Sequence, residues 1–172
     1  MKKLILLLSF LVSLMVFGQE NNQSKHHLGG HIGSVSGMGF SYRYWPTKLG
    51  GQLTFIPIFK NGGDYYMSSG ISALYTLKES QFVDLYSYLG FHLTNNKYTY
   101  TEQYPTPITT VNKYNTYNTG LGIGLKFKLF KNNMDFSLQG GYGFYNIKKD
   151  TYTNKTSFQT YLAAGIGLYY HL

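Results

Sequence analysis

The chain ends in LAAGIGLYYHL, residues Leu162–Leu172, and every second residue of this stretch is apolar. The positions between are Ala163, two glycines, Tyr169 and His171. A period of two is typical of a β-strand whose two faces meet different surroundings. The ends of soluble domains usually fray, whereas this pattern continues to the last residue. It therefore predicts a terminal strand that is paired into a sheet.

The same period recurs along the chain before this strand, and turn residues separate the repeats. No segment after residue 26 has a convincing helical period, so the sequence predicts an all-β fold. The predicted strands cover residues 27–34, 38–45, 51–59, 65–77, 82–94, 116–130, 134–147 and 157–172. The first break is open, because residues 28–45 form either one long strand or a hairpin that turns at Val35–Gly37. The hairpin is favoured, since eight strands close an antiparallel barrel with both chain ends on one side.

The two faces of the predicted strands differ along their whole length. One face is apolar, and the other mixes glycine, hydroxyl, amide and charged residues. On the apolar face, aliphatic residues such as Ile71 and Leu121 fall in mid-strand, and aromatic residues such as Tyr42 and Phe144 fall near the ends. A soluble lipocalin-type barrel has no need for two aromatic belts, whereas a bilayer does. The predicted fold is therefore an eight-stranded antiparallel up-and-down transmembrane β-barrel with its apolar face outward.

The start of the chain predicts export. Lys2 and Lys3 precede an uncharged apolar run from Leu4 to Phe17, and small Gly18 follows, as in a secretory signal peptide. The alternative is an N-terminal anchor, but the run is shorter than a bilayer requires. The predicted organisation is a signal peptide at 1–18, a short segment at 19–26 and the barrel at 27–172. Short connections then share one side with both chain ends, and the long segment 95–115 lies on the other.

These features together resemble the small eight-stranded outer-membrane barrels of Gram-negative bacteria, the OmpA/OmpX type, over essentially the whole mature chain. The resemblance implies an outer-membrane protein with periplasmic chain ends, in contact with the lipid bilayer and lipopolysaccharide. It also implies that the last strand is the signal read by the barrel-assembly machinery, through Ile166, Leu168, Tyr170 and Leu172. Leu172 departs from the usual terminal aromatic residue, and Tyr170 supplies an aromatic ring two residues earlier.

Five charged residues of the polar face are predicted to line the lumen near the periplasmic end: Arg43, Asp84, Lys126, Lys128 and Asp135. Isolated charges are costly in a narrow interior, so these groups should pair and hydrogen-bond. An eight-stranded barrel is just wide enough for its side chains to fill it. The sequence thus favours a closed lumen, with an ion- or small-solute-conducting porin as the alternative.

One stretch of the sequence indicates catalytic chemistry. HLTN at His92–Asn95 resembles the His-x-Ser-Asn motif of outer-membrane lipid A deacylases, with Thr94 in place of the serine. A lipid A-modifying enzyme built on His92 and Thr94 is therefore an alternative function. Both side chains should face inward, away from a lipid substrate. His27 and His31 share a face, yet no carboxylate joins them in the sequence, and no metal site is predicted. No cofactor, no nucleic-acid partner and no enzymatic activity is predicted.

The external segment 95–115 is the predicted site of any specific function. Five tyrosines near it are candidate recognition residues: Tyr98, Tyr100, Tyr104, Tyr114 and Tyr117. Tyrosine offers a large amphipathic contact area at a modest cost in conformational entropy. The leading hypothesis is a structural or adhesive outer-membrane protein whose loops bind an extracellular protein or glycan.

Overall fold

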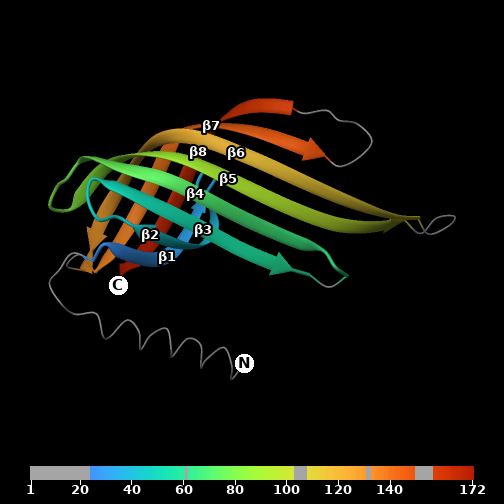
Figure 1. Ribbon diagram of the computed structural model, residues 1–172, viewed down its shortest axis with the longest axis horizontal. Coiled ribbons are helices and arrows are strands. Elements are labelled where there is room, and N and C mark those ends of the chain that lie inside the picture. The colour runs from blue at the N-terminus through green and yellow to red at the C-terminus, as the bar shows by residue number, and fades with distance from the viewer. Residues whose placement is uncertain (1–23, 61, 103–107, 131–132, 150–156) are drawn as a thin grey trace, which may run out of the picture.

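A computed structural model describes residues 24–60, 62–102, 108–130, 133–149 and 157–172, and within them eight strands form one closed barrel. Each strand pairs antiparallel with the next, and β1 pairs with β8 to close the ring (Figure 1). The predicted eight-stranded up-and-down barrel is therefore confirmed. The strands are β1 (His26–Gly33), β2 (Gly37–Tyr44), β3 (Leu49–Phe59), β4 (Tyr65–Lys78), β5 (Val83–Glu102), β6 (Ile108–Leu129), β7 (Met134–Lys149) and β8 (Ser157–His171).

The first hairpin is short and folds inward. The β1–β2 ladder ends at the pair Gly33–Gly37, so the predicted break at Val35–Gly37 is confirmed to within a residue. Gly37 has a φ of 86°, in the left-handed region that glycine adopts without strain. Val35 and Ser36 are almost fully buried, although a turn at a barrel rim would ordinarily face solvent. The turn therefore occupies the interior of the barrel.

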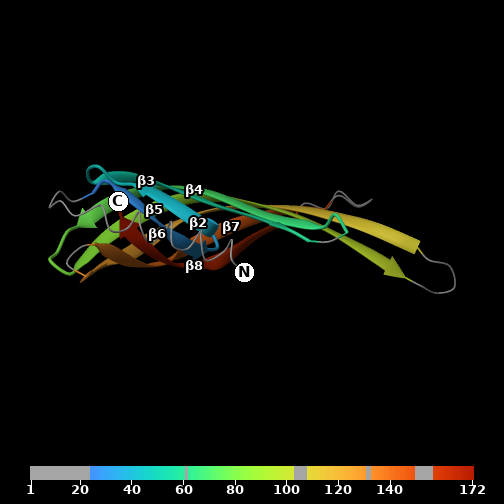
Figure 2. The same ribbon diagram turned by 90° about the horizontal axis from the view of Figure 1, so that it is seen from below.

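The longest hairpin departs from the prediction. Segment 95–115 was expected to be a loop, but β5 runs on to Glu102 and β6 begins at Ile108. The ladder of β5 with β4 ends at Lys97, and that of β6 with β7 ends at Tyr114. Among the described residues, 98–102 and 108–112 then pair only with each other, and we call this two-stranded extension the ribbon. It projects well beyond the other strands (Figures 1 and 2). Its Tyr and Thr residues favour strands, which is why the alternation continues past the barrel.

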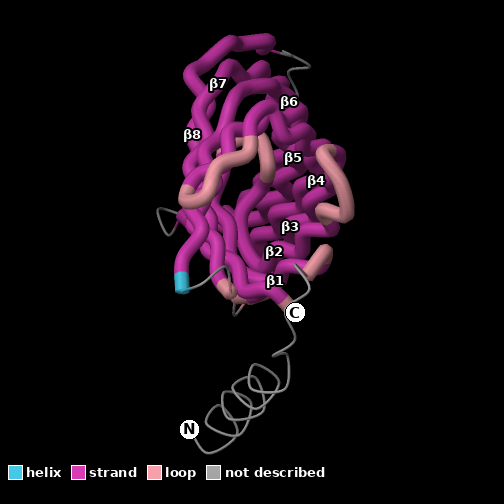
Figure 3. The backbone as a smooth tube through the Cα atoms, turned by 90° about the vertical axis from the view of Figure 1, so that its left-hand side faces the viewer, coloured by secondary structure: helices cyan, strands magenta, loops and turns pink. Residues whose placement is uncertain are grey.

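The two faces of the barrel separate as the parity predicts. Large apolar side chains point outward and are exposed, including Phe40 (76%), Leu162 (77%) and Leu89 (60%). The inner positions hold buried serine, threonine, glutamine and charged residues among the strands that surround the lumen (Figure 3). Among the described residues, no helix is long and apolar enough to cross a membrane.

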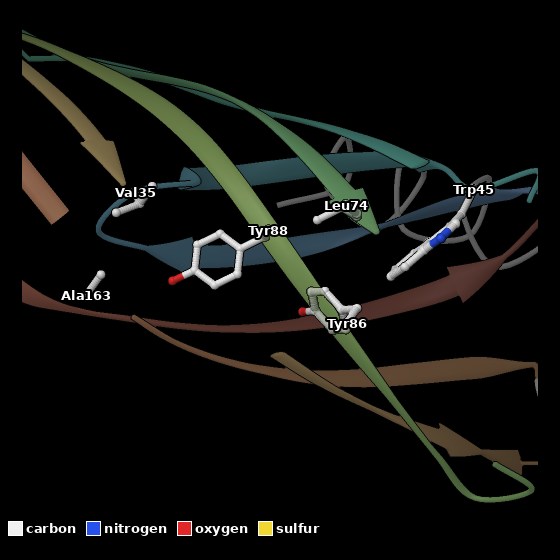
Figure 4. Packing of buried hydrophobic residues seen from close by; sticks show 6 residues of the cluster. All are labelled: Val35, Trp45, Leu74, Tyr86, Tyr88 and Ala163. Atoms are coloured by element: carbon white, nitrogen blue, oxygen red, sulfur yellow. The ribbon is translucent and has the colours of Figure 1, made fainter. Parts of the chain in front are cut away.

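A small apolar cluster fills part of the interior: Val35, Trp45, Leu74, Tyr86, Tyr88 and Ala163 (Figure 4). Trp45 packs edge-on against Tyr86, with ring centroids 5.3 Å apart. Glycines on the facing strands make room for these rings, since a Cβ at Gly124 would lie 2.3 Å from the ring of Tyr86. Glycines on the inner face thus leave the space that the large aromatic side chains occupy.

The start of β1 and the end of β8 lie at the same rim of the barrel, because His27 of β1 is the register partner of His171 of β8. We call it the terminal rim. The short turns β2–β3, β4–β5 and β6–β7 share it, and the ribbon lies at the opposite end. The predicted signal peptide, residues 1–18, and most of segment 19–26 lie outside the described residues.

Candidate functional site

The predicted lumen charges lie on the inner face near the terminal rim, but they form separate groups. Asp84 holds two cations, with its carboxylate oxygens 3.0 Å from Lys126 Nζ and 2.8 Å from Lys128 Nζ. Lys128 also donates to the carbonyl of Ser80, and Lys126 Nζ lies 4.6 Å from the centroid of the Trp45 ring. These contacts give the ammonium groups of both lysines a partner inside the barrel, where the two side chains are largely shielded from water.

Arg43 is completely buried and takes part in no ion pair among the described residues. Its Nε donates to Gln52 Oε1 (2.8 Å), and Nη2 donates to Ser137 Oγ (3.1 Å). The guanidinium carbon lies 3.7 Å from the centroid of the Tyr169 ring. The arginine is thus held by neutral groups and an aromatic face, and it fills the centre of the lumen.

Asp135, the second predicted anion, meets two histidines rather than a predicted cation. Its Oδ2 lies 3.1 Å from His27 Nδ1 and 2.8 Å from His171 Nε2. From the sequence, His27 was considered beside His31 as a possible ligand pair, and His171 was not predicted to meet either His27 or Asp135. The signal was present, because His27, Asp135 and His171 all have inward parity, but it required the β1–β8 pairing that only a closed ring supplies.

The inward turn closes the barrel above these charges. His31 Nε2 and Gln139 Oε1 both lie within hydrogen-bonding distance of Ser36 Oγ, at 2.7 and 2.8 Å. The carbonyl of Ser34 accepts from Tyr161 Oη at 3.2 Å. A Cβ at Gly70 would lie only 2.2 Å from the carbonyl oxygen of Ser36, so the turn rests directly on the β4 backbone. These contacts make the turn a plug of the lumen.

The residues of the enzymatic alternative also face the lumen. His92 is 6% exposed, and its Nε2 lies 2.9 Å from Ser68 Oγ and 3.1 Å from Thr94 Oγ1. Its Nδ1 lies 3.1 Å from the carbonyl oxygen of Ser34, which fixes the ring against the plug. A base beside a hydroxyl resembles a catalytic pair, but Ser68 is fully buried and neither group faces the outer surface, where a lipid substrate would have to bind.

The candidate recognition tyrosines divide between the ribbon and the barrel. Tyr98 and Tyr114 stack across the ribbon base, with centroids 5.5 Å apart and hydroxyl oxygens 2.9 Å apart. Tyr100 is 58% exposed on the ribbon. Tyr117 instead packs beside Phe91 on the barrel wall, and Tyr104 lies outside the described residues.

The predicted assembly residues lie on the outer face of β8 and at its end. Ile166 and Leu168 are half exposed and face outward, as does Leu172 just beyond the strand. Tyr170 also has this parity and is the register partner of both Leu28 and Met134. Their role in assembly stays a prediction.

No protein-family model and no curated protein matches the sequence. Solved structures that are similar in shape include the following two. One is the crystal structure of Neisserial surface protein A (NspA), at 18% identity and a TM-score of 0.47, covering 87% of this chain and 98% of that one. The other is the N-terminal β-barrel domain of Pseudomonas aeruginosa OprF, at 16% identity and a TM-score of 0.45, covering 84% and 93%.

Proposed function

We propose that this chain is an integral outer-membrane barrel with a closed lumen, whose ribbon is a surface-recognition element. The outward apolar face carries the membrane part of the proposal. A soluble protein rarely leaves large side chains such as Phe40, Leu89 and Leu162 this exposed around a whole ring. A barrel can cross a membrane because closure satisfies every backbone group between strands.

The orientation follows from the lengths of the connections. Short turns lie at the terminal rim, whereas the ribbon extends from the opposite end. Outer-membrane barrels have short periplasmic turns and longer extracellular loops. This asymmetry supports periplasmic chain ends and an extracellular ribbon, in a leaflet rich in lipopolysaccharide.

The closed lumen supports a structural or adhesive role over a porin. Arg43, Tyr86 and Tyr169 are fully buried in it, and the inward turn covers them. In planar bilayers the reconstituted barrel should show no stable conductance, and in liposomes it should not speed sugar-driven swelling. A steady open channel would contradict this part of the proposal.

The ribbon carries the recognition part. Among the described residues, the backbone of the ribbon pairs on one side only, which leaves its two outer edges as candidate sites for strand addition by an extended partner. Tyr98, Tyr100 and Val111 are 40%, 58% and 49% exposed on it, which adds aromatic and aliphatic contact area. A protein partner with an extended segment fits these edges best, and a glycan stacked on the tyrosines is the second candidate.

The test removes the ribbon and leaves the barrel. Lys97 and Lys113 are register partners, so a short Gly-Ser turn in place of residues 98–112 should preserve every ladder to β4 and β7. The shortened protein should fractionate with the outer membrane and keep heat-modifiable migration on gels, while cells lose binding to a partner captured by the intact barrel. The matched control replaces Lys60–Asp64 at the β3–β4 tip with a turn of the same composition. Failure of the shortened chain to insert, or full binding by it, would refute the assignment of function to the ribbon.

A further inference from the structure

Three potential metal ligands meet at the terminal rim, on the inner face of the barrel. His27 Nδ1, Asp135 Oδ2 and His171 Nε2 all lie within 4.8 Å of one another. They come from β1, β7 and β8, three strands that are adjacent only because the ring closes. The register sets His27 opposite His171, with ring centroids 4.1 Å apart. Backbone pairing, and not a flexible loop, therefore holds these groups together.

The three groups lie at ion-pair distance from one another, but their hydrogen bonding is incomplete. Their side chains are 4%, 1% and 13% exposed in the order His27, Asp135, His171. Asp135 Oδ2 lies 3.1 Å from His27 Nδ1 and 2.8 Å from His171 Nε2. Among the described residues, neither these nitrogens nor the two carboxylate oxygens have a hydrogen-bond partner of good geometry. Buried polar groups in this condition cost free energy, and a shared ligand would lower that cost.

A divalent transition-metal ion matches this group of side chains in ligand type and size. Two imidazoles and one carboxylate are a donor set for Zn²⁺-class ions, whereas Ca²⁺ and Mg²⁺ prefer oxygen ligands alone. With bonds of about 2.0–2.2 Å in a tetrahedron, ligand atoms lie roughly 3.3–3.6 Å apart. The two nitrogen–oxygen distances, 3.1 and 2.8 Å, would therefore have to open by less than about 1 Å.

The surroundings supply a fourth position. All three residues line a cavity of about 350 Å³ at the terminal rim, wide enough for a bound water. Three lysines and two further carboxylates line it too: Lys25, Lys126, Lys128, Glu79 and Asp84. Asp84 pairs with Lys126 and Lys128. These two cations are thus committed to another carboxylate and leave Asp135 to the histidines.

We propose that His27, Asp135 and His171 bind one Zn²⁺-class ion, which joins the first and last strands across the seam of the barrel. This inference does not depend on the function proposed for the ribbon. Because the ligands lie on both sides of the β1–β8 ladder and on β7, the bound ion favours the closed ring. Binding to the folded state alone stabilises that state by mass action.

The experiment uses the full mature barrel, made without a histidine tag, folded in detergent micelles and stripped with a chelator. Titration calorimetry with Zn²⁺ should give one ion per chain, and Co²⁺ should give the visible absorption of a tetrahedral centre. His27→Ala and His171→Ala should each weaken binding by more than about 100-fold, since loss of an outer-shell partner alone costs 10–100-fold. Asp135→Asn keeps the side-chain shape and should also weaken binding. Zn²⁺ should raise the urea midpoint of the parent barrel and leave that of His171→Ala unchanged.

Two other histidines provide matched controls. His26 neighbours His27 but faces outward near the Tyr42 hydroxyl, and His92 is buried elsewhere in the lumen. His26→Ala and His92→Ala should bind Zn²⁺ as the parent does, and heat-modifiable migration confirms that every variant is folded. The proposal is overturned if the parent binds no ion, if binding survives the loss of both His27 and His171, or if Asp84→Asn abolishes it instead.

Discussion

The terminal rim and the ribbon are built from the same alternating strands, yet they are different kinds of structure. At the rim each strand has two neighbours, and its inner side chains meet others across a closed lumen, as Arg43 of β2 meets Ser137 of β7. Among the described residues, each strand of the ribbon has one neighbour and no interior. Identical local patterning thus produces a core where the ring closes and an exposed surface where it does not. Stability should reside in the first region, and tolerance of change in the second.

The largest effect is expected where the plug touches the wall. A methyl group at Gly70 would lie 2.2 Å from the Ser36 carbonyl oxygen, and backbone cannot yield cheaply. Gly70→Ala should lower the free energy of unfolding by about 3 kcal/mol, the upper end of the usual cost of overpacking. Urea unfolding in micelles measures it. Gly140→Ala is the control, because its Cβ would meet nothing within 4 Å, and equal losses in the two variants would disprove the contact.

A smaller loss is expected from the ion cluster. Asp84→Asn keeps the size of the side chain and leaves Lys126 and Lys128 with no carboxylate between them. Because the lysines are only 14% and 16% exposed, the cost should be about 2 kcal/mol by the same measurement. Glu79→Gln, an exposed acid on the same cavity, should change stability by less than about 0.5 kcal/mol. An Asp84 variant as stable as the Glu79 variant would mean that the cluster is solvated.

The smallest effect on overall stability is expected in the ribbon. Tyr98→Ala removes one aromatic cross-strand pair and should cost no more than about 0.5 kcal/mol globally. Its local effect should be larger, since the amides of residues 98–102 and 108–112 pair in a single ladder among the described residues. Hydrogen exchange should be faster there than in β7, and faster still in the variant. If the amides of the ribbon exchange as slowly as those of β7, the ribbon is as stable as the barrel and the expected difference between the two regions is wrong.

Sequence alone was sufficient for what depends on the period of two. The parity of Arg43, Asp84 and Asp135 placed them inside, and the turn at Val35–Gly37 followed from the need for an even strand number. The sequence was insufficient for contacts between side chains on strands that are far apart in the chain. That Asp135 meets His27 and His171 depends on ring closure. The alternation of Tyr and Thr continues into segment 95–115 and indicates an extension of the sheet, but it does not fix where the strands stop, so the ends of β5 and β6 were set too short.

If the barrel spans a membrane as proposed, the short length of β1 and β2 has a consequence for the surrounding lipid. Each has eight residues, and the ladders to their outer neighbours end at Gly33–Gly165 and Phe40–Phe55. At about 3.3 Å per residue and a tilt of about 40°, such a strand rises roughly 20 Å along the membrane normal. The apolar band of an outer-membrane barrel is about 25 Å tall. On this side the hydrocarbon must therefore thin by roughly 5 Å, while β4, with 14 residues, spans it fully. The hydrophobic mismatch is therefore confined to the side of the barrel formed by β1 and β2. Such a barrel should insert most readily into bilayers of short-chain lipids.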